Sequence, residues 1–96
     1  MTIAVPKPSQ TALTVLRRAN YTPLRDPRTG TLSYVRRLGP NFYPRFHLYV
    51  EEGPERWRLD LHLDQKQASY RGSNRHSGEY DGATVSAEAM RLQKFF

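Results

Sequence analysis

Two runs of alternating apolar and polar residues, separated by a short turn, constrain the fold of this chain more than any other feature of its sequence. Residues 45–51 and 57–66 alternate with a period of two, and Glu52–Glu55, which contains Gly and Pro, separates them. This period is typical of β-strands with one buried face, and Gly and Pro favour turns. We therefore predict an antiparallel hairpin whose buried face is formed by Phe46, Leu48, Val50, Trp57, Leu59, Leu61 and Leu63.

The register of this hairpin is restricted because the apolar faces of the two strands must coincide. A four-residue turn that sets Glu51 opposite Arg56 meets this condition and also pairs His47 with Asp60. Both pairs are charge-complementary, and such cross-strand pairs favour one register over another. We expect this pairing, although a shift of two residues in either direction satisfies the apolar faces equally well.

Two helices and one further strand complete the predicted fold. Apolar residues recur at helical spacing over Ser9–Asn20, with Ser9 as the N-cap, and again in a final helix that is capped by Ser86. A strand over Thr31–Leu38 follows a turn at Asp26–Gly30. We predict an α+β fold in the order α-β-β-β-α, a three-stranded antiparallel meander sheet with both helices on one face.

A single domain is expected, because a chain of 96 residues supports one hydrophobic core. Residues 1–8, which include Pro6 and Pro8, are interpreted as an extended lead-in, and residues 9–96 as the domain. Residues 67–84 show no periodic pattern and are predicted to form a long loop. Loops of this length are uncommon in compact domains and usually carry function.

Composition excludes several classes of protein. The chain has no Cys, which excludes disulfides, thiolate nucleophiles and Cys-type zinc sites. No apolar stretch approaches the length of a membrane span, and the first residues do not resemble a signal peptide. We expect a cytoplasmic protein that has no membrane contact and no cofactor.

Positive charge is concentrated in the first half of the chain. The net charge is +6, and residues 1–46 hold eight Lys and Arg against one acidic residue, Asp26. Twelve of the fifteen cations are Arg, whose forked guanidinium suits phosphate recognition. A preference for Arg codons across the genome would give the same composition, but a basic half of this kind also attracts polyanions. The charge therefore favours a nucleic-acid partner.

The segment Gly39–Val50 resembles part of the double-stranded-RNA-binding domain. In that family a Gly-Pro turn is followed at fixed spacing by Pro, Phe and an alternating strand, and the matching residues here are Gly39, Pro40, Pro44, Phe46 and Val50. The chain departs from the family at Phe42, where a His is usual, and it lacks the Lys residues at the start of the last helix. The resemblance implies the α-β-β-β-α order, and it implies contacts of the Gly39–Asn41 turn and the first helix with successive minor grooves of duplex RNA.

Charge and resemblance together predict a surface that binds nucleic acid, RNA more than DNA. In the long loop, Arg71 and Arg75 could clamp a phosphate while Tyr70 and Tyr80 stack on bases. The predicted binding residues are Arg17, Arg18, Arg36, Arg37, Gly39, Pro40, Asn41, Arg45, Lys66, Tyr70, Arg71 and Arg75.

An adaptor that binds another protein is an alternative from a different class. Aromatic and Arg side chains dominate the energetics of protein interfaces, and an Arg-rich surface can dock an acidic partner. The anchors of such an adaptor would be Phe42, Tyr43, Tyr70, Tyr80 and Phe95.

Catalysis is a third possibility, because the three His residues fall on the polar face of the predicted hairpin or in the loop that follows it. His47 paired with Asp60 could act as a general base in a hydrolase or nuclease, with His62 nearby and Arg45 stabilising a phosphorane. Polar residues on a solvated sheet face, however, need no function.

The same His residues allow a metal-dependent variant of this hypothesis. His62 and Asp64 lie two residues apart on one strand and point to the same side. If the long loop folds back, His76 or Glu79 could complete a set of three zinc ligands with an open fourth position. The chain contains no established metal-site spacing, so this hypothesis depends on the path of the loop.

Overall fold

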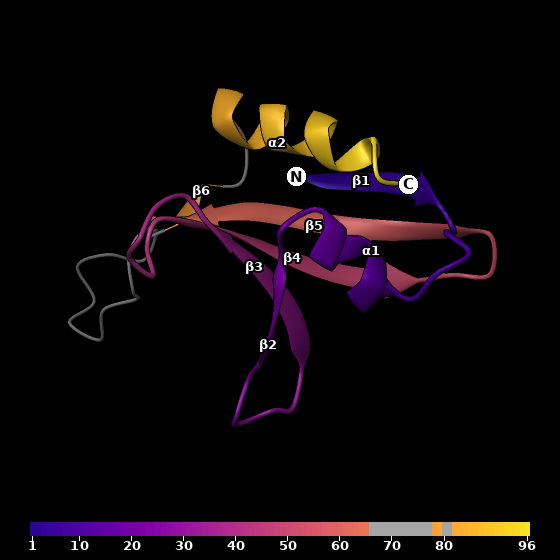
Figure 1. The fold of residues 1–96 in the computed structure, drawn as a ribbon, viewed down its shortest axis with the longest axis horizontal. Helices are drawn as coiled ribbons and strands as arrows, with labels where there is room; N and C mark the ends of the chain where they lie inside the picture. Colours follow the sequence, from indigo (N-terminus) through magenta and orange to yellow (C-terminus); the bar gives the residue numbers. More distant parts are fainter. Residues whose placement is uncertain (66–77, 80–81) are drawn as a thin grey trace.

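An antiparallel sheet backed by two helices forms the fold of the computed structural model, which describes residues 1–65, 78–79 and 82–96 (Figure 1). The elements are β1 (Thr2–Pro6), α1 (Ala12–Arg18), β2 (Thr22–Arg25), β3 (Leu32–Arg37), β4 (Arg45–Glu52), β5 (Arg56–Asp64), β6 (Gly78–Glu79) and α2 (Ala83–Gln93). Five strands lie in the order β1-β5-β4-β3-β2, and the short β6 pairs with the end of β5 beyond β1. Every pair of neighbours is antiparallel.

The predicted three-stranded sheet in the order α-β-β-β-α is wrong, because β1 and β2 extend it on both sides. β1 arises from residues interpreted as a lead-in: Val5 is buried and lies opposite Trp57, and Ile3 lies opposite Leu59. Its partner β5 is distant in sequence, so no turn or local pattern indicates that the two strands pair. The α+β class and the antiparallel arrangement remain as predicted.

β2 was not predicted either, because its Pro23 argues against a strand. Pro23 lies inside β2, and Pro is found in sheets almost only on edge strands, where one side of the backbone makes no ladder. β2 pairs only with β3, so Pro23 satisfies this condition. Pro6 satisfies it on the opposite edge, where it ends β1.

Both helices begin at different residues than predicted. α1 is capped by Thr11 rather than Ser9, and Thr11 Oγ1 accepts a hydrogen bond from the Thr14 amide at 3.2 Å. Asn20, which adopts a positive φ of 73°, follows the end of this helix as expected for a C-terminal stop. α2 begins after Gly82 rather than at Ser86, because the extra first turn packs Val85 into the core.

The hydrophobic core lies between the helices and one face of the sheet, as the alternating pattern predicts. Leu59 and Leu61 of β5 are fully buried, together with Leu16 of α1 and Leu92 of α2. Both helices belong to the same buried cluster, so both cover the same face. The opposite face carries the alternate residues of β4 and β5, and no helix of the described residues covers it.

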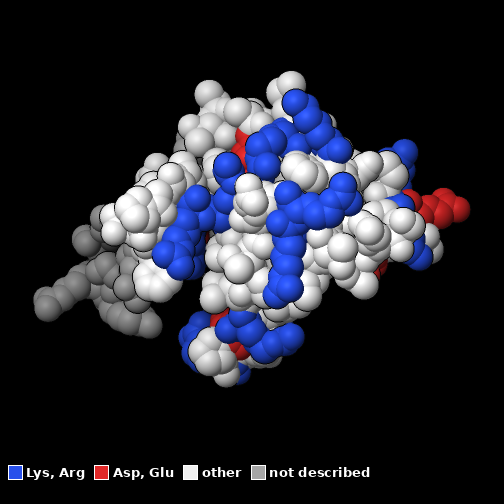
Figure 2. Space-filling model, viewed as in Figure 1, with Lys and Arg blue, Asp and Glu red and all other residues white. Residues whose placement is uncertain are grey.

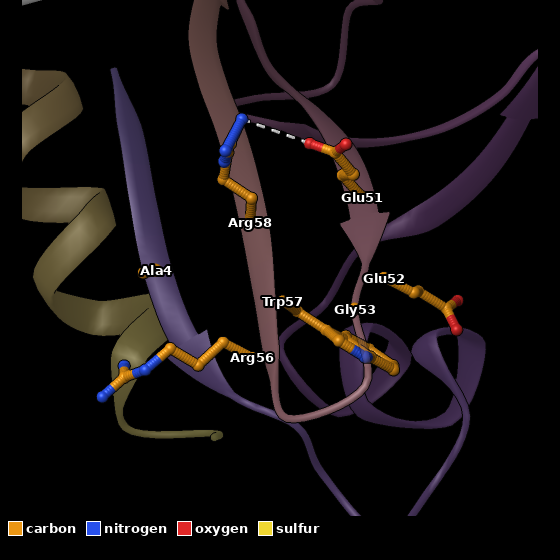
Figure 3. A pocket seen from close by; sticks show the side chains of 7 residues that line it. All are labelled: Ala4, Glu51, Glu52, Gly53, Arg56, Trp57 and Arg58. Carbon is orange, nitrogen blue, oxygen red and sulfur yellow. Dashed lines mark ion pairs between the residues drawn. The ribbon is translucent and has the colours of Figure 1, made fainter.

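The β4–β5 hairpin adopts one of the two registers that were left open, not the one we expected. Glu52 lies opposite Trp57, and therefore Glu51 lies opposite Arg58 rather than Arg56. The turn that joins β4 to β5 contains Gly53 (Figure 3). Pro54 follows Gly53 in the sequence, and Pro favours turns because its ring fixes the backbone angle φ. Gly53 fits because a Cβ at this residue would lie 2.5 Å from the backbone oxygen of Arg56.

Replacing Gly53 with Ala is expected to destabilise the protein by about 1–3 kcal/mol, because the added methyl group forces the turn apart. Urea unfolding followed by circular dichroism measures this change. Gly39→Ala is the matched control, since a Cβ at Gly39 meets nothing within 4 Å. Equal stability of the two variants would show that the turn does not determine the hairpin register.

Candidate functional site

A cluster of charged and imidazole side chains occupies the face of the sheet opposite the helices. The hairpin register sets His47 opposite His62 and Arg45 opposite Asp64. Asp64 Oδ2 lies 2.9 Å from His47 Nδ1, and Asp64 Oδ1 lies 3.0 Å from His62 Nε2. Arg45 Nε donates a hydrogen bond to Asp64 Oδ2 at 3.2 Å. These four residues are termed the His–Asp cluster.

Asp64 is the centre of this cluster and is ionised. The four side chains are only 12–19 % exposed. Burial by itself raises the pKa of Asp64, but the hydrogen bonds from His47 and His62 outweigh burial and hold the pKa well below its ordinary value. The carboxylate therefore keeps its charge while it organises the surrounding donors.

Ser33 of β3 extends the cluster on its other side. Its Oγ lies 2.9 Å from His47 Nε2 and 3.2 Å from the backbone oxygen of Leu24. The line Ser33–His47–Asp64 has the order of a nucleophilic triad. Ser33, however, is only 4 % exposed in the middle of a strand, which leaves little of its surface for a substrate carbonyl. Ser33 was not among the predicted site residues, although it alternates with Leu32 and Tyr34 toward the polar face.

An aromatic side chain and a hollow adjoin the cluster. The ring of Tyr49 stacks on His47 with centroids 4.8 Å apart and is 39 % exposed. A hollow of about 420 Å³ lies on this side, and its lining includes Ser33, Arg45, His47 and Tyr49. The cluster is thus partly enclosed, yet it borders a surface that a ligand can approach.

The structure brings some predicted catalytic and metal-binding residues together and separates others. The predicted pairing of His47 with Asp60 is wrong, because the observed register sets Asp60 opposite Tyr49 and leaves it exposed. His62 and Asp64 do lie together, as expected for neighbours on one strand face. His76 lies outside the described residues, and of Glu79 only the backbone is described, opposite Leu63.

The predicted nucleic-acid-binding residues do not form one continuous surface. Arg17 and Arg18 are exposed at the end of α1. Arg36 and Arg37 point to opposite faces of β3, since successive strand residues alternate. The exposed loop Gly39–Asn41 follows β3, and Arg45 is held in the His–Asp cluster. The other predicted residues, together with Tyr80 of the adaptor alternative, lie outside the described residues: Lys66, Tyr70, Arg71 and Arg75.

Arg37 and the aromatic residues after β3 form a second exposed feature. The guanidinium of Arg37 lies 4.7 Å from the ring centroid of Phe42, which is 65 % exposed. Tyr43, half-buried, lies under the guanidinium of Arg45 at 4.6 Å. Phe95, the remaining predicted anchor, is half-buried against the core cluster.

Unpaired cations dominate the surface of the described part of the chain. Five Lys and Arg side chains there form ion pairs. Among the described residues, three carboxylates form no ion pair: Glu52, Glu55 and Asp60. The exposed cations without an acidic partner there are Lys7, Arg17, Arg18, Arg25, Arg37, Arg56 and Lys94. Figure 2 shows Lys and Arg side chains across the face that carries α1, with few acidic atoms between them.

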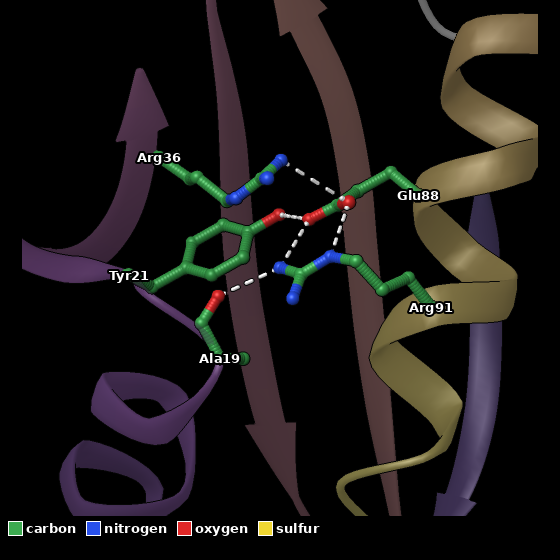
Figure 4. A network of polar contacts seen from close by, with 5 residues as sticks. All are labelled: Ala19, Tyr21, Arg36, Glu88 and Arg91. Atoms are coloured by element: carbon green, nitrogen blue, oxygen red, sulfur yellow. Dashed lines mark hydrogen bonds and ion pairs between the residues drawn. The ribbon is translucent and has the colours of Figure 1, made fainter. Parts of the chain in front are cut away.

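A buried polar network joins the two helices beneath this basic face (Figure 4). Glu88 of α2 is 4 % exposed and accepts hydrogen bonds from Tyr21 at 2.6 Å and from Arg91 at 2.8 Å and 3.0 Å. Arg36 reaches the same carboxylate at 3.4 Å, and Arg91 also donates to the backbone oxygen of Ala19. Burial, and then the contact with Glu88, raises the pKa of Tyr21, which keeps its hydroxyl a neutral donor.

Comparisons with known proteins give no match for this chain, whether against protein-family models, curated proteins or solved structures. Among the described residues, neither helix has the length and apolar character needed to cross a membrane. The case for a function therefore rests on the side chains of this chain.

The stabilising effect of Asp64 is expected to disappear in acid. Because its folded pKa lies below the unfolded value of about 3.9, the contribution is complete above that pH and is lost as the pH falls toward the folded value. Asp64→Asn should cost about 1–3 kcal/mol near neutral pH, and this difference from wild type should shrink below about pH 4.

Urea unfolding of both proteins at a series of pH values measures this difference. Asp60→Asn is the control, since Asp60 is exposed on the same strand and has no ion pair in the described part of the chain. A difference between wild type and Asp64→Asn that stays constant from neutral to acidic pH would contradict the assignment of charge to Asp64.

Proposed function

We propose that this protein binds nucleic acid, RNA in preference to DNA, mainly through contacts between guanidinium groups and phosphates. The observation that carries the proposal is the excess of exposed cations without an acidic partner among the described residues, seven against three unpaired carboxylates. Such a surface attracts a polyanion and releases its counterions, which is the main source of affinity for phosphate backbones.

The end of α1 and the adjoining side of α2 supply the centre of the proposed surface. Arg17 and Arg18 project from the last turn of α1. Arg36 and Arg91 share the single carboxylate of Glu88, so this network keeps a net positive charge. A shallow hollow of about 510 Å³ beside Glu88 is lined by both guanidiniums and by the first residues of α2. The net positive charge of this lining suits a phosphate group of a nucleic-acid backbone.

The exposed loop after β3 supplies a different kind of contact. Arg37 and the 65 % exposed ring of Phe42 offer a stacking platform for a base, a contact that tolerates any sequence. The resemblance of Gly39–Val50 to the double-stranded-RNA-binding domain favours RNA over DNA as the ligand. Recognition on this basis depends on shape and phosphate position more than on base identity.

Removal of the positive charges of Arg17 and Arg18 is expected to lower the affinity for nucleic acid and to make that affinity less dependent on salt concentration. Arg17→Gln combined with Arg18→Gln should make the slope of log K against log salt less negative by about 1.4 for single-stranded RNA. Fluorescence anisotropy titrations over a range of salt concentrations, with duplex RNA, single-stranded RNA and duplex DNA, measure affinity and slope.

The matched control replaces Arg25, the last residue of β2, and Arg28, in the turn that follows it, with Gln; this turn lies away from both helices (Figure 1). Both double variants lose the same net charge. Equal loss of affinity would mean that overall charge, and not the α1 surface, determines binding. No binding of wild type at micromolar concentration in low salt to any of the three ligands would remove the proposed function.

A further inference from the structure

The His–Asp cluster matches the requirements of a metal centre. We propose that His47, His62 and Asp64 bind one divalent transition-metal ion, of which Zn²⁺ is the representative. One ligand atom from each residue lies within 4.8 Å of the other two. This inference is independent of nucleic-acid binding, because none of the three residues belongs to the proposed nucleic-acid-binding surface around Arg17 and Arg18.

The distances in the cluster suit metal–ligand bonds. Bonds of about 2.1 Å hold neighbouring ligand atoms about 3.0 Å apart in octahedral geometry and about 3.4 Å apart in tetrahedral geometry. The separations between imidazole nitrogens and carboxylate oxygens are 2.9 Å for His47 and 3.0 Å for His62. No two of the three ligand atoms lie more than 4.8 Å apart, so an ion fits between the three groups once side-chain rotations shorten the widest separation.

The donor set selects the class of ion. Two imidazoles with one carboxylate suit zinc and its first-row neighbours, whereas magnesium and calcium prefer oxygen ligands alone. Three protein ligands leave at least one coordination position for water or a substrate, which is the arrangement of catalytic rather than structural zinc sites. Of the three proposed ligands, His47 lines the hollow beside Ser33 and Tyr49, so this ligand borders a surface that small molecules can approach.

The hydrogen bonds around His47 support a metal on its Nδ1. Ser33 has one hydroxyl proton, and both the Leu24 oxygen and His47 Nε2 are within its reach. If this proton goes to Leu24, then Nε2 carries a proton and donates it to Ser33. In that arrangement Nδ1 is the nitrogen that faces Asp64 and the proposed ion. Ligating His residues generally donate their other N–H to an oxygen in this way.

Arg45 acts on the carboxylate from outside the ligand set. Its Nε fixes Asp64 Oδ2 at 3.2 Å, and its guanidinium is held over the ring of Tyr43. Such outer contacts orient a ligating carboxylate, although the positive charge of Arg45 opposes a cation. The net effect is a well-oriented site of moderate affinity.

Titration of the chelator-treated full-length chain with Zn²⁺ tests the proposal directly. Isothermal calorimetry should show one site of micromolar or tighter affinity. Bound Co²⁺ should give ligand-field absorption with nitrogen ligands, and Zn²⁺ should raise the melting temperature by mass action.

Variants identify the ligands. His62→Gln and Asp64→Asn should each weaken Zn²⁺ binding at least about tenfold, and Ser33→Ala should weaken it less. Asp60→Asn, an exposed carboxylate on the same strand, should leave affinity unchanged. Circular dichroism establishes that each variant is folded.

A measurement on the wild type covers the case of a variant that fails to fold. The imidazole NMR signals of His47 and His62 should both shift in a Zn²⁺ titration and saturate at one equivalent. Absence of Zn²⁺ binding at micromolar concentration overturns the proposal. So does binding that shifts neither imidazole, or that survives unchanged in folded His62→Gln and Asp64→Asn proteins.

Discussion

β5 is hydrogen-bonded along both of its edges, to β4 on one side and to β1 and β6 on the other, and the remaining structure is arranged around it. The pairing of β4 with β5 has to satisfy two separate conditions. Burial of Leu59 and Leu61 requires only that the apolar faces coincide, which several registers achieve. In the register that is adopted, the turn requires a residue without a Cβ at Gly53, which lies close to the Arg56 oxygen. A shift of two residues would preserve the core but would separate His47 from His62 and Asp64.

The parts of the fold that follow from local pattern could be predicted, and those that depend on distant pairing could not. Period-two alternation located β4 and β5 and assigned their buried face correctly, because each strand carries that information in its own residues. β1 pairs with residues far along the chain, so its own sequence does not indicate the pairing. Pro23 lies inside β2 and argues against a strand there. Thr11 and Gly82 replaced the expected caps because tertiary packing moved the helix boundaries.

The candidate site shows the same division. The sequence placed His62 and Asp64 on one side of a strand, since residues two apart always share a face. The hairpin register and the neighbouring strand β3 determined which other side chains contact His62 and Asp64. The register of the hairpin sets Tyr49, and not His47, opposite Asp60. The same register brings His47 within hydrogen-bond distance of Asp64. The neighbouring β3 contributed Ser33, a residue type too common in sequences to attract notice alone.

The prolines on the two outer strands have a consequence for how copies of this chain behave when they meet. A free sheet edge is a template on which another strand can assemble, and this is a common route to aggregation. Pro6 in β1 and Pro23 in β2 each remove one backbone donor from an outer strand. A second molecule that pairs with either outer strand would meet an interrupted hydrogen-bond ladder, so the two prolines disfavour edge-to-edge association of sheets.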